Sequence, residues 1–183
     1  NNKEINVEKF KNWYKQNGTP LVKFKRKWDK EKQTLKIQAS QTNLNKKNLY
    51  NDLPLIIPID IEIFLSINEK INKTLILKEK EEEFTLENIT SNFDIPIISY
   101  FRNFSAPIKW ETDTTFEEKL LILEFENDYF TIYDTIKGIY KKIICERIYE
   151  EPDINIENKL ISTLRSIIRN NKSINLSLLS EIL

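Results

Sequence analysis

The sequence predicts an antiparallel β-sandwich followed by a series of short helices. Two observations support this fold class. Apolar and polar residues alternate with a period of two in several runs between Leu21 and Phe104, which is typical of strands that bury one face. From Asp113 onward, apolar residues recur at intervals of three and four, as they do on helices with one buried face.

A short amphipathic helix is expected over residues 5–17, ahead of the first strand. Its apolar side chains fall at helical spacing: Val7, Phe10, Trp13 and Tyr14. Gly18 suits the end of this helix. Pro20 starts an extended segment, because proline lacks a backbone donor and disfavours helix in the residue before it.

The strands begin with a hairpin that has one dry face and one wet face. On its first strand the dry face carries Val22, Phe24 and Trp28, and the wet face carries Lys23, Lys25 and Lys27. After a polar turn at 29–33, the second strand alternates Leu35, Ile37 and Ala39 with Lys36, Gln38 and Ser40.

Further strands follow a polar loop over residues 42–52. Apolar residues alternate from Ile57 to Leu65, a strong strand signal, and Pro58 on the outward set indicates an edge strand or a bulge. Shorter strands are expected at 74–77, 84–86 and 97–104. Together these runs give roughly six or seven strands, which is typical of an antiparallel sandwich.

Four helices are expected after Pro107. The first is capped by the run 113–115 and carries Phe116, Leu120 and Leu123. The second spans residues 128–150, and its stripe is Tyr129, Ile132, Tyr133, Ile136, Tyr140, Ile143, Ile144 and Arg147. The third carries Leu160, Ile161, Leu164, Ile167 and Ile168, and the fourth carries Leu178, Leu179 and Ile182. Because an apolar stripe still runs at Leu183, we expect truncation or a missing partner surface.

Composition excludes several classes of function. The 28 basic and 28 acidic residues balance, so nothing electrostatic favours nucleic acid or an anionic membrane as a partner. No apolar run reaches the roughly 18–20 residues that span a bilayer. One cysteine, Cys145, excludes an internal disulfide and fits a reducing compartment.

Two residue types are missing altogether. Without histidine, the chain cannot perform Ser-His, Cys-His or His-zinc chemistry. Without methionine, even at the start, the sequence is expected to be an excised segment. Only two glycines are present, so phosphate-cradling loops are not expected.

For each candidate site, we prefer a structural interpretation to a functional one. Lys23, Lys25, Arg26 and Lys27 are interpreted as a solvated strand face rather than a basic patch, and Lys78–Glu83 as a solvated turn rather than a cation site. Asp60 and Glu62 are interpreted as neighbours on a wet strand face rather than paired catalytic carboxylates. Cys145 is expected to be buried and inert. Of Trp13, Trp28 and Trp110, we expect Trp28 in the core and Trp110 where sandwich and helices meet.

Two longer motifs resemble a known family. The run Phe10–Pro20 contains Trp13, Tyr14, Gln16, Gly18, Thr19 and Pro20, which match a Trp-Tyr-x-Gln-x-Gly-Thr-Pro pattern of bacterial-type aminopeptidase N. The run Phe101–Lys109 is similar to the family's Arg-x-Phe-Ser-Ala-Pro-Val-Lys segment. Weaker similarities lie at Leu55–Ile59, Glu118–Leu123 and Leu178–Leu183, in the same order as in the family. Residues 127–134 depart from the family's Phe-Asn-Arg-Trp-Glu run.

The resemblance implies a piece of a four-domain, cytoplasmic zinc enzyme that removes N-terminal residues from peptides. Residues 1–19 would be the tail of the catalytic domain, residues 20–112 an immunoglobulin-like β-sandwich, and residues 113–183 the N-terminal part of a helical domain. The family's His-Glu-x-x-His and Gly-x-Met-Glu-Asn motifs are missing here, so we expect no catalytic, cofactor-binding or metal-ligating residue in this segment. Zinc would belong to the parent enzyme, and the partners would be the other domains of the same chain.

Two alternatives remain open at this stage. The chain could be a free-standing protein-interaction module, or a catalytically silent homologue that keeps the shell as a scaffold. A complete small enzyme would need an unusual carboxylate or lysine mechanism, because histidine is missing.

Overall fold

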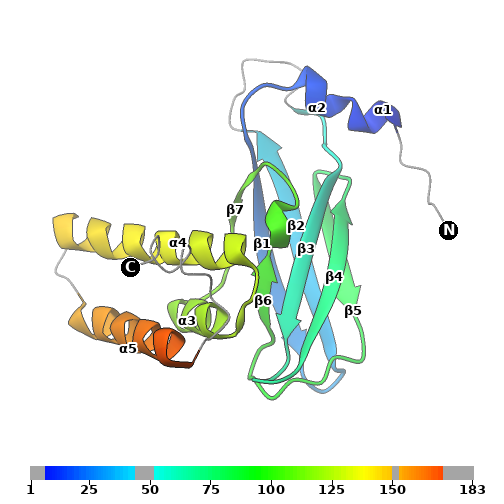
Figure 1. Cartoon of the computed structure of the whole chain (residues 1–183). Helices are drawn as coiled ribbons and strands as arrows, with labels where there is room; N and C mark the ends of the chain where they lie inside the picture. Colours follow the sequence, from blue (N-terminus) through cyan, green and yellow to red (C-terminus); the bar gives the residue numbers. More distant parts are fainter. Residues whose placement is uncertain (1–6, 44–51, 150–152, 171–183) are drawn as a thin grey trace. The chain divides into compact units, whose positions relative to one another are not determined.

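The computed structural model describes residues 7–43, 52–149 and 153–170. The chain divides into two compact units, Asn1–Asp113 and Thr114–Leu183 (Figure 1).

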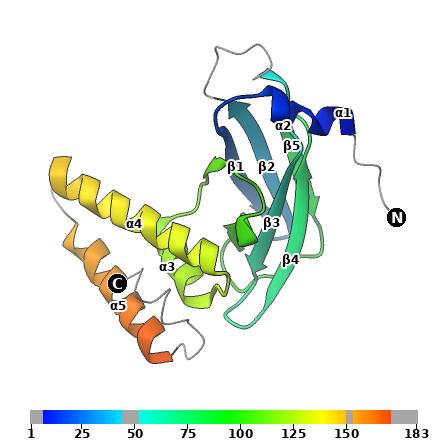
Figure 2. The same ribbon diagram turned by 45° about the horizontal axis from the view of Figure 1, so that its top comes forward.

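The first unit is the predicted β-sandwich. One sheet has the strand order β5-β2-β1-β7 and the other the order β4-β3-β6 (Figures 1 and 2). The bounds of the first sheet are β1 Pro20–Asp29, β2 Thr34–Asn43, β5 Glu81–Leu86 and β7 Lys109–Glu111. Those of the second are β3 Ile57–Phe64, β4 Lys70–Leu77 and β6 Ile97–Tyr100. The strands pair antiparallel except for β7, which runs parallel to β1.

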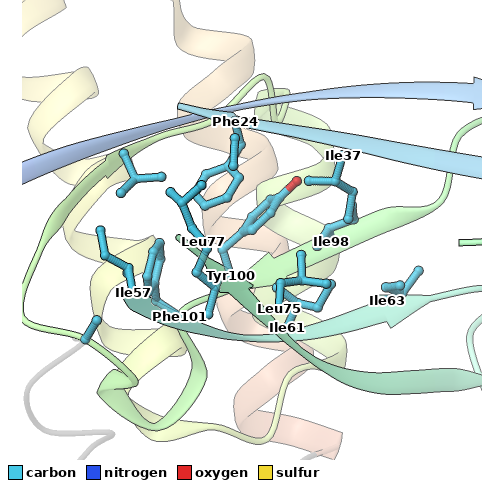
Figure 3. Close-up of a cluster of buried hydrophobic side chains, with 14 of the residues drawn as sticks. Phe24, Ile37, Ile57, Ile61, Ile63, Leu75, Leu77, Ile98, Tyr100 and Phe101 are labelled. Carbon is cyan, nitrogen blue, oxygen red and sulfur yellow. The ribbon is translucent and has the colours of Figure 1, made fainter. Parts of the chain in front are cut away.

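The core lies between the two sheets. Figure 3 shows Phe24 and Ile37 of the four-stranded sheet facing side chains of the three-stranded one, among them Tyr100. The rings of Phe24 and Tyr100 stack with centroids 4.4 Å apart. The predicted dry face of the hairpin is confirmed, because Val22, Phe24, Leu35, Ile37 and Ala39 are buried and Trp28 packs against them.

The interpretation of Pro58 as the mark of an edge strand is wrong. β3 pairs with β4 along its whole length and with β6 on its other side. Proline is tolerated because β6 pairs with β3 only from Ile61 to Phe64. The backbone N–H of Asp60 donates to Ser105 Oγ (3.1 Å) on this side of β3. The nitrogen of Pro58, two residues earlier, points to the same side but lies beyond the end of β6, so its missing N–H costs no hydrogen bond between strands.

The segment after β6 also differs from the prediction. The strand expected over 97–104 ends at Tyr100 and continues as a 3₁₀ turn, η2 (Arg102–Phe104). Phe101, Asn103 and Phe104 have positive φ angles of 56°, 55° and 51°, so the backbone leaves extended geometry here. The three residues of β7 were not predicted, since so short a strand carries no readable period.

Two short helices precede the sandwich in place of the single helix expected over 5–17. These are α1 (Val7–Phe10) and α2 (Asn12–Lys15). The expected start at residue 5 lies outside the described residues. Gly18 has a φ of 86°, a left-handed conformation that turns the chain into β1 and that a side chain would disfavour.

The second unit contains α3 (Phe116–Phe125), α4 (Tyr129–Tyr149) and α5 (Ile154–Asn170). Thr115 caps α3 as predicted and forms a capping box with Glu118. The core of the unit is built from Leu120, Leu123, Ile132, Ile136, Ile139, Leu160 and Ile167. The stripe expected on α4 is wrong in part, because Tyr129 and Ile144 are exposed while Thr131 and Ile139 are buried. The fourth expected helix lies outside the described residues.

Arg147 of α4 binds Glu157 of α5. The guanidinium donates from Nε and Nη2 to the two carboxylate oxygens, each at 2.6 Å. This hydrogen bonding holds the pKa of Glu157 below its usual value. In the described parts of the chain, no helix has the length and apolar composition needed to cross a bilayer.

A cavity in the sandwich core should destabilise the first unit. Ile59 is fully buried in β3, and Ile59→Ala is expected to lower the free energy of unfolding by about 2–5 kcal/mol. Ile76→Ala, on the exposed face of the neighbouring strand β4, removes the same atoms and should cost less than about 1 kcal/mol. Urea denaturation measures both values, and equal losses would contradict the assignment of β3 to the core.

Candidate functional site: two polar clamps at the ends of the sandwich segment

Polar side chains of the first unit gather where the chain reaches the sandwich and where it leaves it. We call Asn12, Trp13 and Gln16 the N-terminal clamp. Arg26 and Asp113 form the C-terminal clamp. Each clamp fixes a segment that lies just outside the main strands.

The N-terminal clamp binds three backbone carbonyls in the segment that leads into β3. Asn12 Nδ2 donates to Pro54 O at 3.0 Å, Trp13 Nε1 to Ile56 O at 2.9 Å, and Gln16 Nε2 to Leu53 O at 2.6 Å. The Trp13 ring also packs against the sandwich core. Both views show α1 and α2 at the end of the sandwich where β1 and β3 begin (Figures 1 and 2).

Buried Gln41 reinforces this end of the sandwich. Its Nε2 donates to Leu55 O (2.9 Å) and Glu79 O (2.8 Å), and its Oε1 accepts from the backbone N–H of Leu55 (2.9 Å). A buried amide of this kind is stabilising only because its donors and acceptor are satisfied. The segment to which the N-terminal clamp binds is therefore held from two sides.

The C-terminal clamp joins β1 to the last residue of the first unit. Arg26 Nε donates to Asp113 Oδ1 and the Arg26 backbone N–H to Asp113 Oδ2, both at 2.8 Å. Arg26 Nη1 donates to Pro96 O at 3.1 Å. The Arg26 side chain is only 4% exposed, so its charge depends on these acceptors.

Arg26 was misassigned to the solvated lysine face. It is two residues from Phe24 and from Trp28, so period-two counting places it on the dry face. A charged residue on a dry face needs a partner, and this was the signal that could have revealed the clamp. The three lysines are exposed as expected, and Lys23 pairs with Glu111 at 2.7 Å.

Glu62 is buried, so its expected place on a wet strand face is wrong. It is 1% exposed; Lys70 Nζ lies 2.9 Å from Oε2 and Arg102 Nη1 lies 3.3 Å from Oε1. Arg102 Nη1 also donates to Asn72 Oδ1 at 2.8 Å. The ion pairs tie η2 to β3 and β4, and this gives Glu62 a structural role.

The other candidate residues also have structural surroundings. Asp60 Oδ1 accepts from Thr74 Oγ1 at 2.6 Å. Residues 81–83 belong to β5, so only 78–80 form the turn expected over 78–83. A hydrogen bond from Lys36 to the exposed Glu83 holds the pKa of that carboxyl below its usual value. Trp110 is half-buried and packs against the sandwich core, with its ring 5.0 Å from that of Phe101.

Cys145 is exposed, so the expected burial of its thiol is wrong. It lies on α4 next to Ile144, a residue of the expected apolar stripe that is exposed. Within residues 7–43, 52–149 and 153–170, no three His, Cys, Asp or Glu side chains come together as a metal site would require.

Two sheets of four and three strands packed face to face define an immunoglobulin-like β-sandwich. Residues 18–113, more than half of the chain, match the family described as "Domain of unknown function (DUF3458) Ig-like fold". The chain belongs to this family.

Longer relatives share the similarity. The chain is 25% identical over 145 residues to "Aminopeptidase N" of Haemophilus influenzae, covering 74% of this chain and 16% of that protein. It is 22% identical over 191 positions to "Aminopeptidase N" of Escherichia coli, covering 98% of this chain and 22% of that protein. The resemblance to aminopeptidase N is thereby confirmed.

A solved structure shares the fold. The crystal structure of Legionella pneumophila aminopeptidase A in complex with aspartic acid matches 97% of this chain and 20% of its own, with a TM-score of 0.80 and 22% identity. The chain thus spans between 16% and 22% of the length of these relatives.

The C-terminal clamp should show strong energetic coupling. In a double-mutant cycle with Arg26→Met and Asp113→Ala, we expect a coupling energy of about 1–3 kcal/mol, because removing Asp113 leaves a buried cation without its carboxylate. The matched control cycle uses Lys23→Met and Glu111→Ala, an exposed pair between the same two segments, and should give less than about 1 kcal/mol. Urea denaturation of the variants measures both, and similar couplings would refute the clamp.

The N-terminal clamp should depend on the indole N–H. Trp13→Phe keeps an aromatic ring but leaves Ile56 O without its donor, and should cost about 1–2 kcal/mol of unfolding free energy. Tyr14→Phe removes a polar atom from the neighbouring exposed ring and should stay within about 0.5 kcal/mol of the parent. Thermal unfolding followed by circular dichroism compares them, and a neutral Trp13→Phe would count against the clamp.

Proposed function

We propose that this chain is a non-catalytic part of a zinc-dependent aminopeptidase that removes N-terminal residues from peptides. In this proposal, residues 1–19 end the catalytic domain, residues 20–112 space and support it, and residues 113–183 begin a helical lid. Partners are the other domains of the same polypeptide, and the enzyme is cytoplasmic and binds neither nucleic acid nor membrane.

One observation carries the proposal. The N-terminal clamp lies within the first motif that resembles aminopeptidase N, and Asp113 of the C-terminal clamp lies four residues after the second. Trp13 and Gln16 of the first motif bind the segment ahead of β3. In the second motif, Arg102 pairs with buried Glu62, and Ser105 accepts a hydrogen bond from the β3 backbone. Clamped ends suit a spacer that must keep a fixed geometry between domains.

Zinc would belong to a part of the enzyme outside these residues. The chain has no histidine, and in its described parts no three Cys, Asp or Glu side chains come together as a metal site would require. These residues do not fit a zinc site, so no catalytic step is assigned to them.

A free-standing interaction module, or a silent scaffold homologue, is the second candidate. It is favoured by exposed apolar side chains on α5, where Ile154, Ile161 and Ile168 recur every seven residues. On a helix such residues share one side, which a protein partner could cover.

The native size of the polypeptide separates the two candidates. An antibody raised against this chain should detect, in a lysate of the source cells, a band several times larger than 21.9 kDa. That band should co-purify with zinc and aminopeptidase activity. A band at 21.9 kDa would exclude the proposal that the chain is part of a larger aminopeptidase. A large band without zinc or activity would favour the catalytically silent homologue.

A further inference from the structure

The connection between α2 and β1 contains the one asparagine of the chain that is followed by glycine. Asn17 and Gly18 lie in neither a helix nor a strand, and both are exposed, whereas the other glycine, Gly138, follows a lysine. Glycine has no side chain to shield its backbone nitrogen, so that nitrogen can reach the side-chain amide of the asparagine before it. The pair therefore has the local features that favour loss of the asparagine amide, a reaction called deamidation.

Deamidation at this pair needs nothing beyond the chain and water. The backbone nitrogen of Gly18 attacks Asn17 Cγ, a new N–Cγ bond forms, and the Cγ–Nδ2 bond breaks. The proton of the attacking nitrogen leaves with the side-chain amide as ammonia. Water then opens the five-membered succinimide ring at one of its two carbonyls. One opening gives aspartate. The other gives isoaspartate, in which the main chain runs through the former side chain and gains one carbon atom.

The structure fixes the length of the chain at this point. Asn43 of β2 pairs with Pro20, the first residue of β1. Its side-chain Nδ2 donates to Asn17 O (3.1 Å) and to Gln16 Oε1 (3.4 Å). Gln16 in turn donates to Leu53 O in the N-terminal clamp. One added carbon lengthens the main chain by about 1.5 Å, which exceeds the roughly 0.5 Å range of normal hydrogen-bond lengths. Isoaspartate would therefore break bonds that hold this segment.

We propose that Asn17 is a site of spontaneous deamidation, and that its conversion to isoaspartate loosens the N-terminal clamp. Asn88 provides a comparison within the same chain, because it is also exposed and lies outside the strands. The next backbone N–H, that of Ile89, donates to Gln33 O at 2.9 Å. That nitrogen is engaged and lies beside a branched side chain, so Asn88 should react more slowly.

Incubation of the full-length polypeptide in mildly alkaline buffer tests the site. Tryptic cleavage after Lys15 and Lys23 releases Asn17 within residues 16–23, and mass spectrometry of separated peptides then distinguishes asparagine, aspartate and isoaspartate. A sample taken before incubation gives the background. We expect Asn17 to convert at least about tenfold faster than Asn88, because the amide after Asn88 must first open. Equal rates at the two positions, or conversion of Asn17 only in denaturant, would overturn the proposal.

Hydrogen exchange of the incubated protein tests the effect on the clamp. The backbone N–H groups of Tyr14 and Gln16 donate to carbonyls one turn earlier. After conversion they should exchange at least roughly fivefold faster, because α2 opens more often when its bonds to the sandwich are lost. Asn17→Gln, in which ring closure is slow, should show no change on incubation. Freshly prepared Asn17→Asp gains the charge without the extra atom and should exchange like the parent. Unchanged exchange after conversion, or equally fast exchange in fresh Asn17→Asp, would refute the loosening by isoaspartate.

Discussion

The burial of two apolar sheet faces against each other holds the first unit together, and most other features depend on it. β3 contributes Ile57, Ile59, Ile61 and Ile63, each at most 1% exposed, against side chains such as Phe24 and Ile37. Removing this surface from water is the main favourable term in folding. It also fixes the register of β3, because a slip of one residue would place Asp60 and Glu62 in the core.

The same constraint determines what the polar residues must do. Arg26 falls on the inward set of β1 and can remain charged there only because Asp113 and Pro96 O accept its hydrogen bonds. Glu62 lies on the outward set of β3, yet Lys70 and Arg102 pair with it. The Arg26–Asp113 and Arg102–Glu62 pairs join segments that are far apart in sequence, so they tie the last residues of the unit to β1 and β3.

The parts of the fold that could be predicted are those in which apolar residues recur at a regular spacing or a helix has a clear capping residue. Alternation from Ile57 to Leu65 and in the first hairpin predicted the sandwich, and the Thr115 cap predicted the start of α3. The rest lacked a local signal. Phe101 and Phe104 adopt positive φ without being glycine, and the partner of Arg26 lies 87 positions away. Cys145 was misplaced because α4 carries more apolar residues than it buries.

The clamps were not predicted: Trp13 and Gln16 belong to a motif quoted only for its resemblance, and Arg26 was assigned to a solvated face. The first motif supplies neutral donors, the Trp13 indole and the Gln16 amide, to backbone carbonyls. The C-terminal clamp uses an ion pair whose cation is buried, so salt should screen it less than the Lys23–Glu111 pair, in which both side chains are exposed. α2 is bonded to the segment ahead of β3, and β7 (Lys109–Glu111) pairs with β1 just before Asp113. The chain is thus held to the sandwich both ahead of β1 and after β7, by contacts that lie within the first unit.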